Sequence, residues 1–343
     1  MSMNQFYESL CAGQSLTTEQ SRELFAEIVG GEVDPILMAG LLTALKIKGE
    51  TPDEIAGAAQ ALRHAAKEFP RPAGQVVDIV GTGGDGLNTI NISSTSVLVA
   101  AAAGVTVCKH GNRSVSSKSG SADLLRTLGV NISMSPNTAA QALEQSNACF
   151  IFAPEYHSGI RHAMPVRGAL KSRTIFNVLG PLINPASPDV MLLGVYAPEL
   201  LEPIAKALVQ LGVTRAFVVH GSGLDEIALH GPTQIAEVNQ SEITLKTVTP
   251  ADFGVEQYPV EDLVGGTPEE NAEIAAAILA GNGTSAHNAA IAVNVGAVLY
   301  LTGKAESLID GTSQALDVLA SGAAIETLAT LCAVSNSDAG ESE

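Results

Sequence analysis

The sequence predicts an α/β fold in which a small N-terminal helical domain precedes a larger domain with a mostly parallel sheet flanked by helices. Three observations lead to this prediction. Capped helical segments fill the first 70 residues. From Gln75 onward, short β-branched segments alternate with helical ones, which is typical of a parallel sheet covered on both faces. With 343 residues, the chain also exceeds one typical hydrophobic core.

Residues 1–70 are expected to form a bundle of three helices, because three helix starts carry capping signals. The predicted starts follow Thr17, Asp34 and Thr51. Two glycines end the first of these helices and one glycine ends the second. No catalytic cluster lies in this region, so packing or dimerisation is its expected role.

Residues 73–343 are expected to form the α/β domain, after a proline-rich hinge. The predicted strands are residues 75–80, 105–108, 148–152, 191–196 and 215–219. A small antiparallel excursion is expected within residues 233–262, and helices near residues 268–280, 286–302 and 311–330. Ligands of such sheets bind at the carboxyl ends of the strands, where the connecting loops emerge.

A glycine turn, Gly81-Thr-Gly-Gly-Asp-Gly86, follows the first predicted strand. Glycines allow backbone angles that are closed to other residues, so a tight turn is expected. Ser93, Ser94 and Thr95 then precede an Ala-rich apolar run and predict the start of a helix. Because helix N-termini attract anions, this strand, turn and helix together predict an anion site.

The turn also satisfies the pattern G-x-G-x-x-G, which occurs in dinucleotide-binding folds. Those folds need an acidic residue about 20 residues further on to hold the ribose hydroxyls. Here the second strand instead leads into Lys109. The sequence also lacks the P-loop pattern G-x-x-x-x-G-K-[ST]. A cation in this position favours a phosphate ligand over a diol, although the glycines alone could serve only a structural turn.

The loop Lys109–Ser121 supplies two lysines, an arginine, five serines and two glycines within 13 residues. Phosphate groups are bound by this combination of positive charge, hydroxyl donors and close backbone approach. A flexible linker could share the Ser/Gly content, but linkers do not usually separate a core strand from a helix. We therefore interpret this segment, called the cation loop below, as a second phosphate-binding element.

Asp225 and Glu226 follow the predicted strand 215–219 and a glycine turn. Neighbouring acids are common on an acidic surface. Their expected position at a strand end, facing the phosphate loops, favours a Mg²⁺ site instead. Mg²⁺ needs only one or two carboxylates when ligand phosphates supply the other oxygens.

The charge is unevenly distributed: the protein as a whole is acidic, but one segment is positively charged. The formal net charge is −18 and the sequence pI is about 4.7, which argues against nucleic acid as a partner. Between Lys109 and Arg173, however, eight Lys/Arg residues oppose three acids, a local charge of +5. This pattern predicts a small anionic ligand.

The four cysteines and the N-terminus indicate a reduced, soluble setting. Cys11, Cys108, Cys149 and Cys332 form no C-x-x-C pair, so neither a thiolate metal site nor a disulfide framework is expected. The N-terminus lacks a basic start followed by an apolar run, and no segment has the length of a membrane span. We expect a cytoplasmic protein with no membrane partner.

Four motifs, in order, carry a resemblance to the anthranilate phosphoribosyltransferase family of tryptophan biosynthesis. They are Gly81–Asp85, Asn91–Ser94, Lys109–Arg113 with Ser116 and Ser117, and Asn177–Pro185. The resemblance covers essentially the whole chain. It implies transfer of phosphoribose from 5-phosphoribosyl 1-pyrophosphate (PRPP) to the amine of anthranilate, with release of pyrophosphate. It also implies a homodimer formed through residues 1–70, with part of residues 164–190 packed on that domain.

The family's site residues transfer to matching positions of this chain. For PRPP these are Gly81, Gly84, Asp85, Thr89, Asn91, Ile92, Ser93, Ser94, Lys109, His110, Gly111, Asn112, Arg113, Ser114, Val115, Ser116, Ser117 and Ser121. For anthranilate they are Gly81, Asn112, Arg167 and His157, and for Mg²⁺ they are Ser93, Asp225 and Glu226. No residue is expected to act as a catalytic acid or base.

Two other functions compete with this prediction. A pyrimidine nucleoside phosphorylase resembles the family in fold and would join nucleoside and phosphate instead. A non-enzymatic relative that binds nucleic acid would have a basic surface and lack the acid pair. This chain is acidic and retains Asp225 and Glu226.

Overall fold

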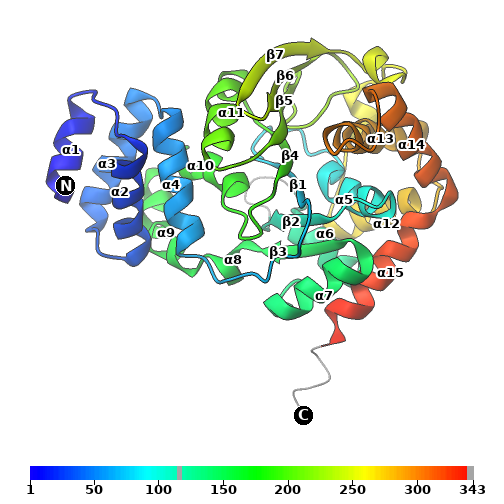
Figure 1. Cartoon of the computed structure of the whole chain (residues 1–343), viewed down its shortest axis with the longest axis horizontal. Coiled ribbons are helices and arrows are strands. Elements are labelled where there is room, and N and C mark those ends of the chain that lie inside the picture. Colours follow the sequence, from blue (N-terminus) through cyan, green and yellow to red (C-terminus); the bar gives the residue numbers. More distant parts are fainter. Residues whose placement is uncertain (114–117, 338–343) are drawn as a thin grey trace.

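The computed structural model describes residues 1–113 and 118–337. Its N-terminal end is a layer of helices, drawn in blue in Figure 1. The helices are α1 (Met3–Cys11), α2 (Thr18–Gly30), α3 (Pro35–Lys48) and α4 (Pro52–His64). The expectation of three helices is wrong by one, because α1 was not predicted. A capping box between Ser2 and Gln5 starts that helix and is the sequence signal for it.

The larger part is built on a seven-stranded sheet of order β3-β2-β1-β4-β5-β6-β7. The strands are β1 (Val77–Gly81), β2 (Val107–Gly111), β3 (Ala148–Phe152), β4 (Val190–Gly194), β5 (Arg215–Gly221), β6 (Thr233–Asn239) and β7 (Glu242–Val248). The first five are parallel, and β6 and β7 pair antiparallel at one edge. The predicted mostly parallel sheet with an antiparallel excursion is therefore confirmed, although β1 and β2 end one and three residues later than predicted.

The strand order reverses beside β1, which lies between β2 and β4. Connections from neighbouring strands diverge to opposite faces at such a switch point and leave a crevice at the carboxyl ends. The glycine turn after β1 and the cation loop after β2 both leave the sheet at this edge, because the two strands are parallel neighbours. The fold thus brings together the two loops that the sequence singled out.

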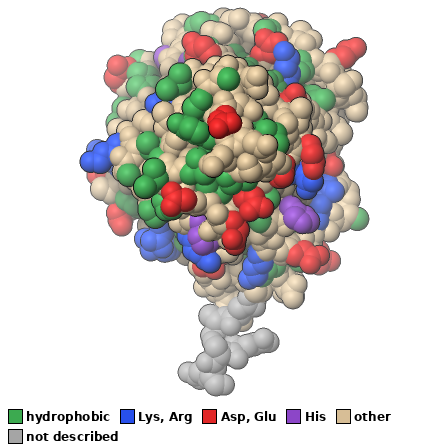
Figure 2. All heavy atoms as spheres, turned by 90° about the vertical axis from the view of Figure 1, so that its left-hand side faces the viewer, with side chains coloured by type: hydrophobic (Ala, Val, Ile, Leu, Met, Phe, Trp, Pro, Cys, Tyr) green, Lys and Arg blue, Asp and Glu red, His purple; other side chains and the backbone are tan. Residues whose placement is uncertain are grey.

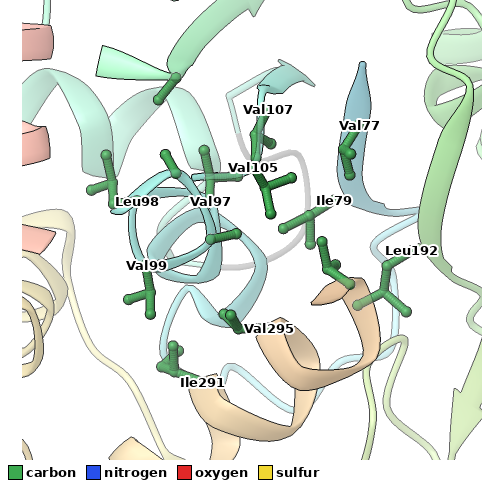
Figure 3. Packing of buried hydrophobic residues seen from close by; sticks show 14 of the residues in the cluster. Val77, Ile79, Val97, Leu98, Val99, Val105, Val107, Leu192, Ile291 and Val295 are labelled. Carbon is green, nitrogen blue, oxygen red and sulfur yellow. The ribbon is translucent and has the colours of Figure 1, made fainter. Parts of the chain in front are cut away.

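One face of the sheet is covered by α5 (Ile92–Ala102) and α13 (Ser285–Leu301). Figure 3 shows Val97 and Leu98 of α5 and Val295 of α13 among the buried side chains of this cluster, near Ile79 of β1. Both helices are buried along most of their length, and the polar residues of α5 are all Ser or Thr. Helix α5 is therefore packed on most sides below the site.

The other face of the sheet shares a buried cluster with the N-terminal helices and α11 (Leu201–Gln210). The chain between β3 and β4 returns to this side (Figure 1). There η1 (Ser158–His162) packs on α2, α9 (Met164–Leu170) on α3 and α10 (Phe176–Leu179) on α4. The intervening elements are α8 (Ala153–Tyr156) and η2 (Gly180–Leu182). This return places Arg167 of α9 on the side of the N-terminal helices.

The remaining elements surround the α/β part. They are α6 (Ser121–Thr127), α7 (Pro136–Ser146), η3 (Pro198–Leu200), η4 (Pro250–Phe253), η5 (Val260–Leu263), α12 (Pro268–Leu279), α14 (Leu308–Ser321) and α15 (Ala323–Ser335). The single helix predicted near residues 311–330 is wrong. Gly322 adopts a φ of 71° and divides it into α14 and α15, which differ in direction by 72°. This left-handed backbone ends a helix and favours glycine.

Within residues 1–113 and 118–337, no single helix has the length and apolar character to cross a membrane. The bent pair α14 and α15 meets those criteria only when its two helices are taken together.

Candidate active site

The glycine turn continues into an extended donor loop, defined here as residues 82–91. Gly83, Gly84 and Gly86 have φ values of 67°, 84° and 80°, which only glycine adopts without strain. The hydroxyl of Thr82 accepts a hydrogen bond of 3.1 Å from the backbone N–H of Tyr196, after β4. The loop is therefore tied to the neighbouring strand end, but residues 82–88 form no hydrogen-bonded turn, so the predicted tight turn is wrong.

Helix α5 begins at Ile92 with Asn91 as its N-cap residue, earlier than the Ser93–Thr95 start that was predicted. Ser93 and Ser94 consequently lie in its first turn. The side chain of Asn91 makes no capping hydrogen bond to its own helix. The first N–H groups of a helix need external acceptors, and the Ser93 N–H has one in the carboxylate of Glu226, which shows that this end accommodates an anion.

The predicted acid pair lies directly against these two elements. Asp225 accepts a hydrogen bond of 2.6 Å from the backbone N–H of Gly83 in the donor loop. Glu226 accepts from the backbone N–H of Ser93 at 3.2 Å, and it accepts a second hydrogen bond from the Ser93 hydroxyl. The structure therefore joins the three predicted Mg²⁺ residues in one group beside the donor loop.

Three glycines at strand ends make room for the acid-bearing loop. Gly81 ends β1, Gly194 ends β4 and Gly221 ends β5. A Cβ on Gly81 or Gly194 would overlap atoms of Asp225, and one on Gly221 would overlap the carbonyl oxygen of Glu226. The acid pair thus crosses the strand ends at backbone contact, which only residues without a side chain permit.

The environment of the acid pair disfavours two negative charges. Burial and the nearby charge of Asp85 raise the pKa of Asp225 to about 6. Burial and the charge of Asp225 raise the pKa of Glu226 to about 8, although hydrogen bonds from Ser93 act in the opposite direction. A cation placed between these oxygens would relieve both effects.

The donor set fits a Mg²⁺ ion that shares its coordination with a ligand. No cluster of three or more His, Cys, Asp or Glu side chains suited to a metal occurs among the described residues. Two carboxylates and the Ser93 hydroxyl would leave the other positions to phosphate oxygens and water, the arrangement Mg²⁺ prefers. The carboxylates and the adjacent phosphate-type loops therefore fit the predicted ion.

The cation loop begins with Lys109 and His110, which are buried near the end of β2. The Lys109 ammonium donates to the Ile79 carbonyl oxygen at 2.6 Å, and burial lowers its pKa while Asp78 and the acid pair act in the opposite direction. The hydroxyl of Ser121 donates to the carbonyl oxygen of Asn112 at 3.2 Å and closes the loop at its far end. Ser114, Val115, Ser116 and Ser117, also predicted to bind PRPP, lie outside the described residues.

His110 and His157 form a buried pair behind this loop. Their ring centroids are 5.1 Å apart in an edge-to-face arrangement, and His110 Nδ1 lies 3.1 Å from the Gly180 carbonyl oxygen. Burial lowers the pKa of His110 to about 3 and that of His157 to about 4. Both imidazoles are therefore neutral at pH 7, and each has a buried Nε2 without a partner among the described residues.

Arg167 is the predicted site residue on α9, the helix that packs on α3 of the N-terminal helices. Its guanidinium lies 5.3 Å from the centroid of the Phe176 ring, and its nearest polar partner is the Met164 sulfur at 3.8 Å. Among the described residues it forms no salt bridge. Burial lowers its pKa. A planar cation without a carboxylate partner is available for an anionic ligand.

The other predicted residues occupy supporting positions. Leu87 N–H donates to the Asp85 carboxylate at 3.3 Å, and Thr89 forms an isolated antiparallel bridge with Val264. The guanidinium of Arg113 lies 5.8 Å from the Phe152 ring. Buried or close-packed positions are held by Ile92, Ser94 and Gly111.

Sequence reasoning assigned no role to two residues that contact the site. Arg173 stacks on Tyr196 at 3.7 Å and donates a hydrogen bond of 2.7 Å to the Gly84 carbonyl oxygen. Asn271, in α12, donates to the Asn91 side chain at 2.8 Å. Arg173 was counted only as part of the local positive charge. Nothing near Asn271 in the sequence indicates a contact with a loop 180 residues away.

Comparisons with known proteins identify the class of protein to which this chain belongs. Residues 4–66 match the helical bundle domain of the glycosyl transferase family, and residues 73–325 match its a/b domain. An anthranilate phosphoribosyltransferase from Aeromonas salmonicida is 60% identical over 337 residues, covering 98% of this chain and 100% of the relative. One from Colwellia psychrerythraea is 58% identical, covering 98% of this chain and 93% of the relative.

Solved structures agree with these matches. The anthranilate phosphoribosyltransferase from Thermus thermophilus has a TM-score of 0.93 and 43% identity, covering 97% of this chain and 99% of that one. The Saccharomyces cerevisiae enzyme in complex with PRPP and Mg has a TM-score of 0.88 and 28% identity, covering 98% of both chains. The present chain belongs to the anthranilate phosphoribosyltransferase family.

Proposed function

We propose that this protein transfers phosphoribose from PRPP to the amine of anthranilate, giving N-(5-phosphoribosyl)anthranilate and pyrophosphate. One C–O bond to pyrophosphate breaks, one C–N bond to the amine forms, and the amine loses a proton. The observation that carries the proposal is the convergence of Gly83, Ser93 and the acid pair at the switch point of the sheet. This step is the second in tryptophan synthesis from chorismate.

The donor is proposed to occupy the crevice between the donor loop and the cation loop. Backbone N–H groups of the glycine turn and the start of α5 would bind its phosphate oxygens, with Ser93, Ser94 and Lys109 adding donors and charge. The Gly83 and Ser93 donors are held by the acid pair, so binding would exchange these partners, and the donors would then stabilise the charge that develops on departing pyrophosphate. No nucleophilic side chain is required for this displacement.

Asp225, Glu226 and Ser93 are proposed to hold Mg²⁺. When bound, the ion would neutralise charge on the pyrophosphate group. The corresponding yeast enzyme has been solved with PRPP and Mg, which supports this assignment. The raised pKa values of the acid pair are consistent with a site that is completed by a cation.

The acceptor is proposed to lie between Asn112, Arg167 and the histidine pair. The planar guanidinium of Arg167 suits a carboxylate bound by two hydrogen bonds. The neutral imidazoles of His110 and His157 would contact the aromatic ring without adding charge near the amine. The yeast enzyme has also been solved with 4-fluoroanthranilate.

The test is a fluorescence assay with purified protein, anthranilate, PRPP and Mg²⁺. Anthranilate fluorescence should fall with time, because the reaction alters the amine of the fluorophore itself. Omitting PRPP or adding a chelator should abolish the change. Incubation with thymidine and phosphate should release no thymine. Release of thymine without any loss of anthranilate would instead establish a nucleoside phosphorylase.

We further propose that residues 1–70 form a dimerisation domain and residues 73–343 the catalytic domain. The support is an apolar surface on the helical end, seen face-on in Figure 2. Ile36 and Ile47 of α3 are 85% and 81% exposed, and Tyr7 and Met164 are also exposed there. The two isoleucines are eleven positions apart, so they lie on the same face of α3 about 16 Å apart.

Replacing Ile47 with glutamate is expected to dissociate the dimer. A charge introduced into an apolar interface loses its hydration, so the Kd of the dimer should rise by at least about 10²-fold. Sedimentation velocity over a range of concentrations measures this change. Ile309→Glu is the matched control, because Ile309 is 55% exposed on α14 at the other end of the chain. A dimer that persists in Ile47→Glu would exclude this surface.

A further inference from the structure

The second half of the donor loop is held by a distant segment, residues 263–271. Thr89 and Val264 form an antiparallel bridge. On either side of it, the Ile90 N–H donates to the Leu263 carbonyl oxygen at 2.9 Å, and the Gly265 N–H donates to the Asn88 carbonyl oxygen at 2.8 Å. The donor loop is therefore fixed by the same backbone hydrogen bonding that joins strands of a sheet.

Asn271 lies in the first turn of α12 and is 3% exposed. Its Oδ1 accepts a hydrogen bond of 2.7 Å from the Gly266 backbone N–H, and its Nδ2 donates to Asn91 Oδ1 at 2.8 Å. The amide oxygen thus binds the backbone of its own segment, while the amide nitrogen binds the donor loop. A buried amide satisfied at both ends has a fixed orientation.

Asn91 connects this contact to the cation loop. Its Nδ2 donates to the Ser119 carbonyl oxygen at 3.0 Å, and its Oδ1 also accepts from the Ser119 hydroxyl at 3.2 Å. An asparagine at an N-cap position usually caps its own helix, but this one does not. Its side chain instead joins the donor loop, the cation loop and α12.

Helix α12 provides a rigid base for this connection. Ala272 and Ala275 pack with Leu124 of α6, the helix that follows the cation loop. A Cβ on Gly265 would lie 2.6 Å from Asn271 Oδ1 and 2.7 Å from the Thr89 carbonyl oxygen, so the two segments are in backbone contact. No space separates the two segments, so the position of the Asn271 side chain directly affects the position of the donor loop.

We infer that Asn271 is a positioning residue for PRPP. It acts through Asn91, whose amide it orients so that the donor loop and the cation loop keep the separation that the donor requires. This inference rests on the proposed function. Asn271 itself would not contact the substrate. Segment 263–271 would support the donor site from behind the donor loop.

The decisive variant is Asn271→Asp, which has nearly the same shape. A carboxylate still accepts from the Gly266 N–H but places an acceptor against Asn91 Oδ1. If the Asn91 amide turns over to compensate, its oxygen then faces the Ser119 carbonyl oxygen. The variant thus removes the link to the donor loop and preserves the hydrogen bond from the Gly266 N–H.

Calorimetric titration with PRPP and Mg²⁺, together with steady-state kinetics, measures the effect. Asn271→Asp should raise the Kd and the KM for PRPP about 10-fold, the effect of one buried hydrogen bond, and leave the KM for anthranilate within about twofold. Asn288→Asp is the matched control. Asn288 lies in the first turn of α13, and its side chain donates to the Gly283 carbonyl oxygen at 3.2 Å. It should leave both constants unchanged.

A double-mutant cycle separates positioning through Asn91 from a general structural role. The KM for PRPP in Asn91→Ala with Asn271→Ala should match that of Asn91→Ala alone, because the second change has nothing left to orient. Additive losses would overturn the inference, as would an Asn271→Asp variant that binds PRPP like the wild type.

The outcomes also distinguish this inference from the proposed function. A wild-type protein that binds no PRPP overturns both. A wild-type protein that converts anthranilate, with an unaffected Asn271→Asp variant, overturns the inference alone. Binding of PRPP without conversion of anthranilate overturns the proposed reaction, while the calorimetric comparison still decides the role of Asn271.

Discussion

Replacing Asp225 with asparagine and Glu226 with glutamine is expected to lower kcat/KM on the order of 10³-fold, the effect of losing a metal ion and fixed charge at the leaving group. The change keeps the size of both side chains and leaves oxygens that can accept from the Gly83 and Ser93 N–H groups. Only the two negative charges are removed. Initial rates measured across a Mg²⁺ titration would check this result.

Thermal unfolding shows whether this loss comes from chemistry or from folding. The acid pair has raised pKa values, so its ionised form is destabilised in the folded protein. At pH 8 without metal, the double variant should therefore unfold at the same temperature as the wild type or higher. Asp317→Asn with Glu326→Gln removes the same charge from exposed positions on α14 and α15 and should retain activity. Full activity in the acid-pair variant would exclude these residues from the metal site.

Arg167→Ala is expected to raise the KM for anthranilate about 10- to 100-fold and to change the KM for PRPP little. Hydrogen bonds to a charged group contribute about 1.5–3 kcal/mol, which corresponds to this range. Arg167 has no carboxylate partner among the described residues, so no protein salt bridge is broken by the change. Steady-state kinetics with each substrate varied in turn measures both constants.

Arg161→Ala is the matched control for this prediction. Arg161 is an exposed arginine in η1, on the same chain segment as Arg167. It should have normal constants for both substrates. Arg167→Lys should recover only part of the loss, because an ammonium group cannot form two parallel hydrogen bonds with a carboxylate. Equal increases in both KM values for Arg167→Ala would contradict the carboxylate assignment.

The parts of this fold that the sequence predicted well are those with local signals. Thr17 and Thr51 each begin a capped helix, and the β-branched residues of β1 and the Phe and Ile residues of β3 form buried strands. The position of Gly81 after a strand and before an apolar helix also placed the glycine turn at a sheet edge. Such patterns depend on neighbouring residues alone, so a single chain suffices to interpret them.

The contacts that sequence reasoning missed depend on tertiary structure. Asn271 meets Asn91 only because α12 packs beside α6 and α5. Arg173 reaches Gly84 only because the chain returns from the helical end to the sheet. The break at Gly322 was missed because an apolar, Ala-rich run favours one continuous helix, while the backbone there turns at a single glycine.

The glycines that end β1, β4 and β5 have a consequence for altering this enzyme's specificity. Since Gly81, Gly194 and Gly221 carry no side chains beneath the acid pair, the strand ends offer no positions at which an engineer could introduce new groups. If Arg167 binds the acceptor as proposed, variation would instead enter through Arg167 and its neighbours on α9, which belong to a separate layer of the molecule. A library directed at α9 could therefore seek new aromatic amines as acceptors while the machinery for the sugar donor stays intact.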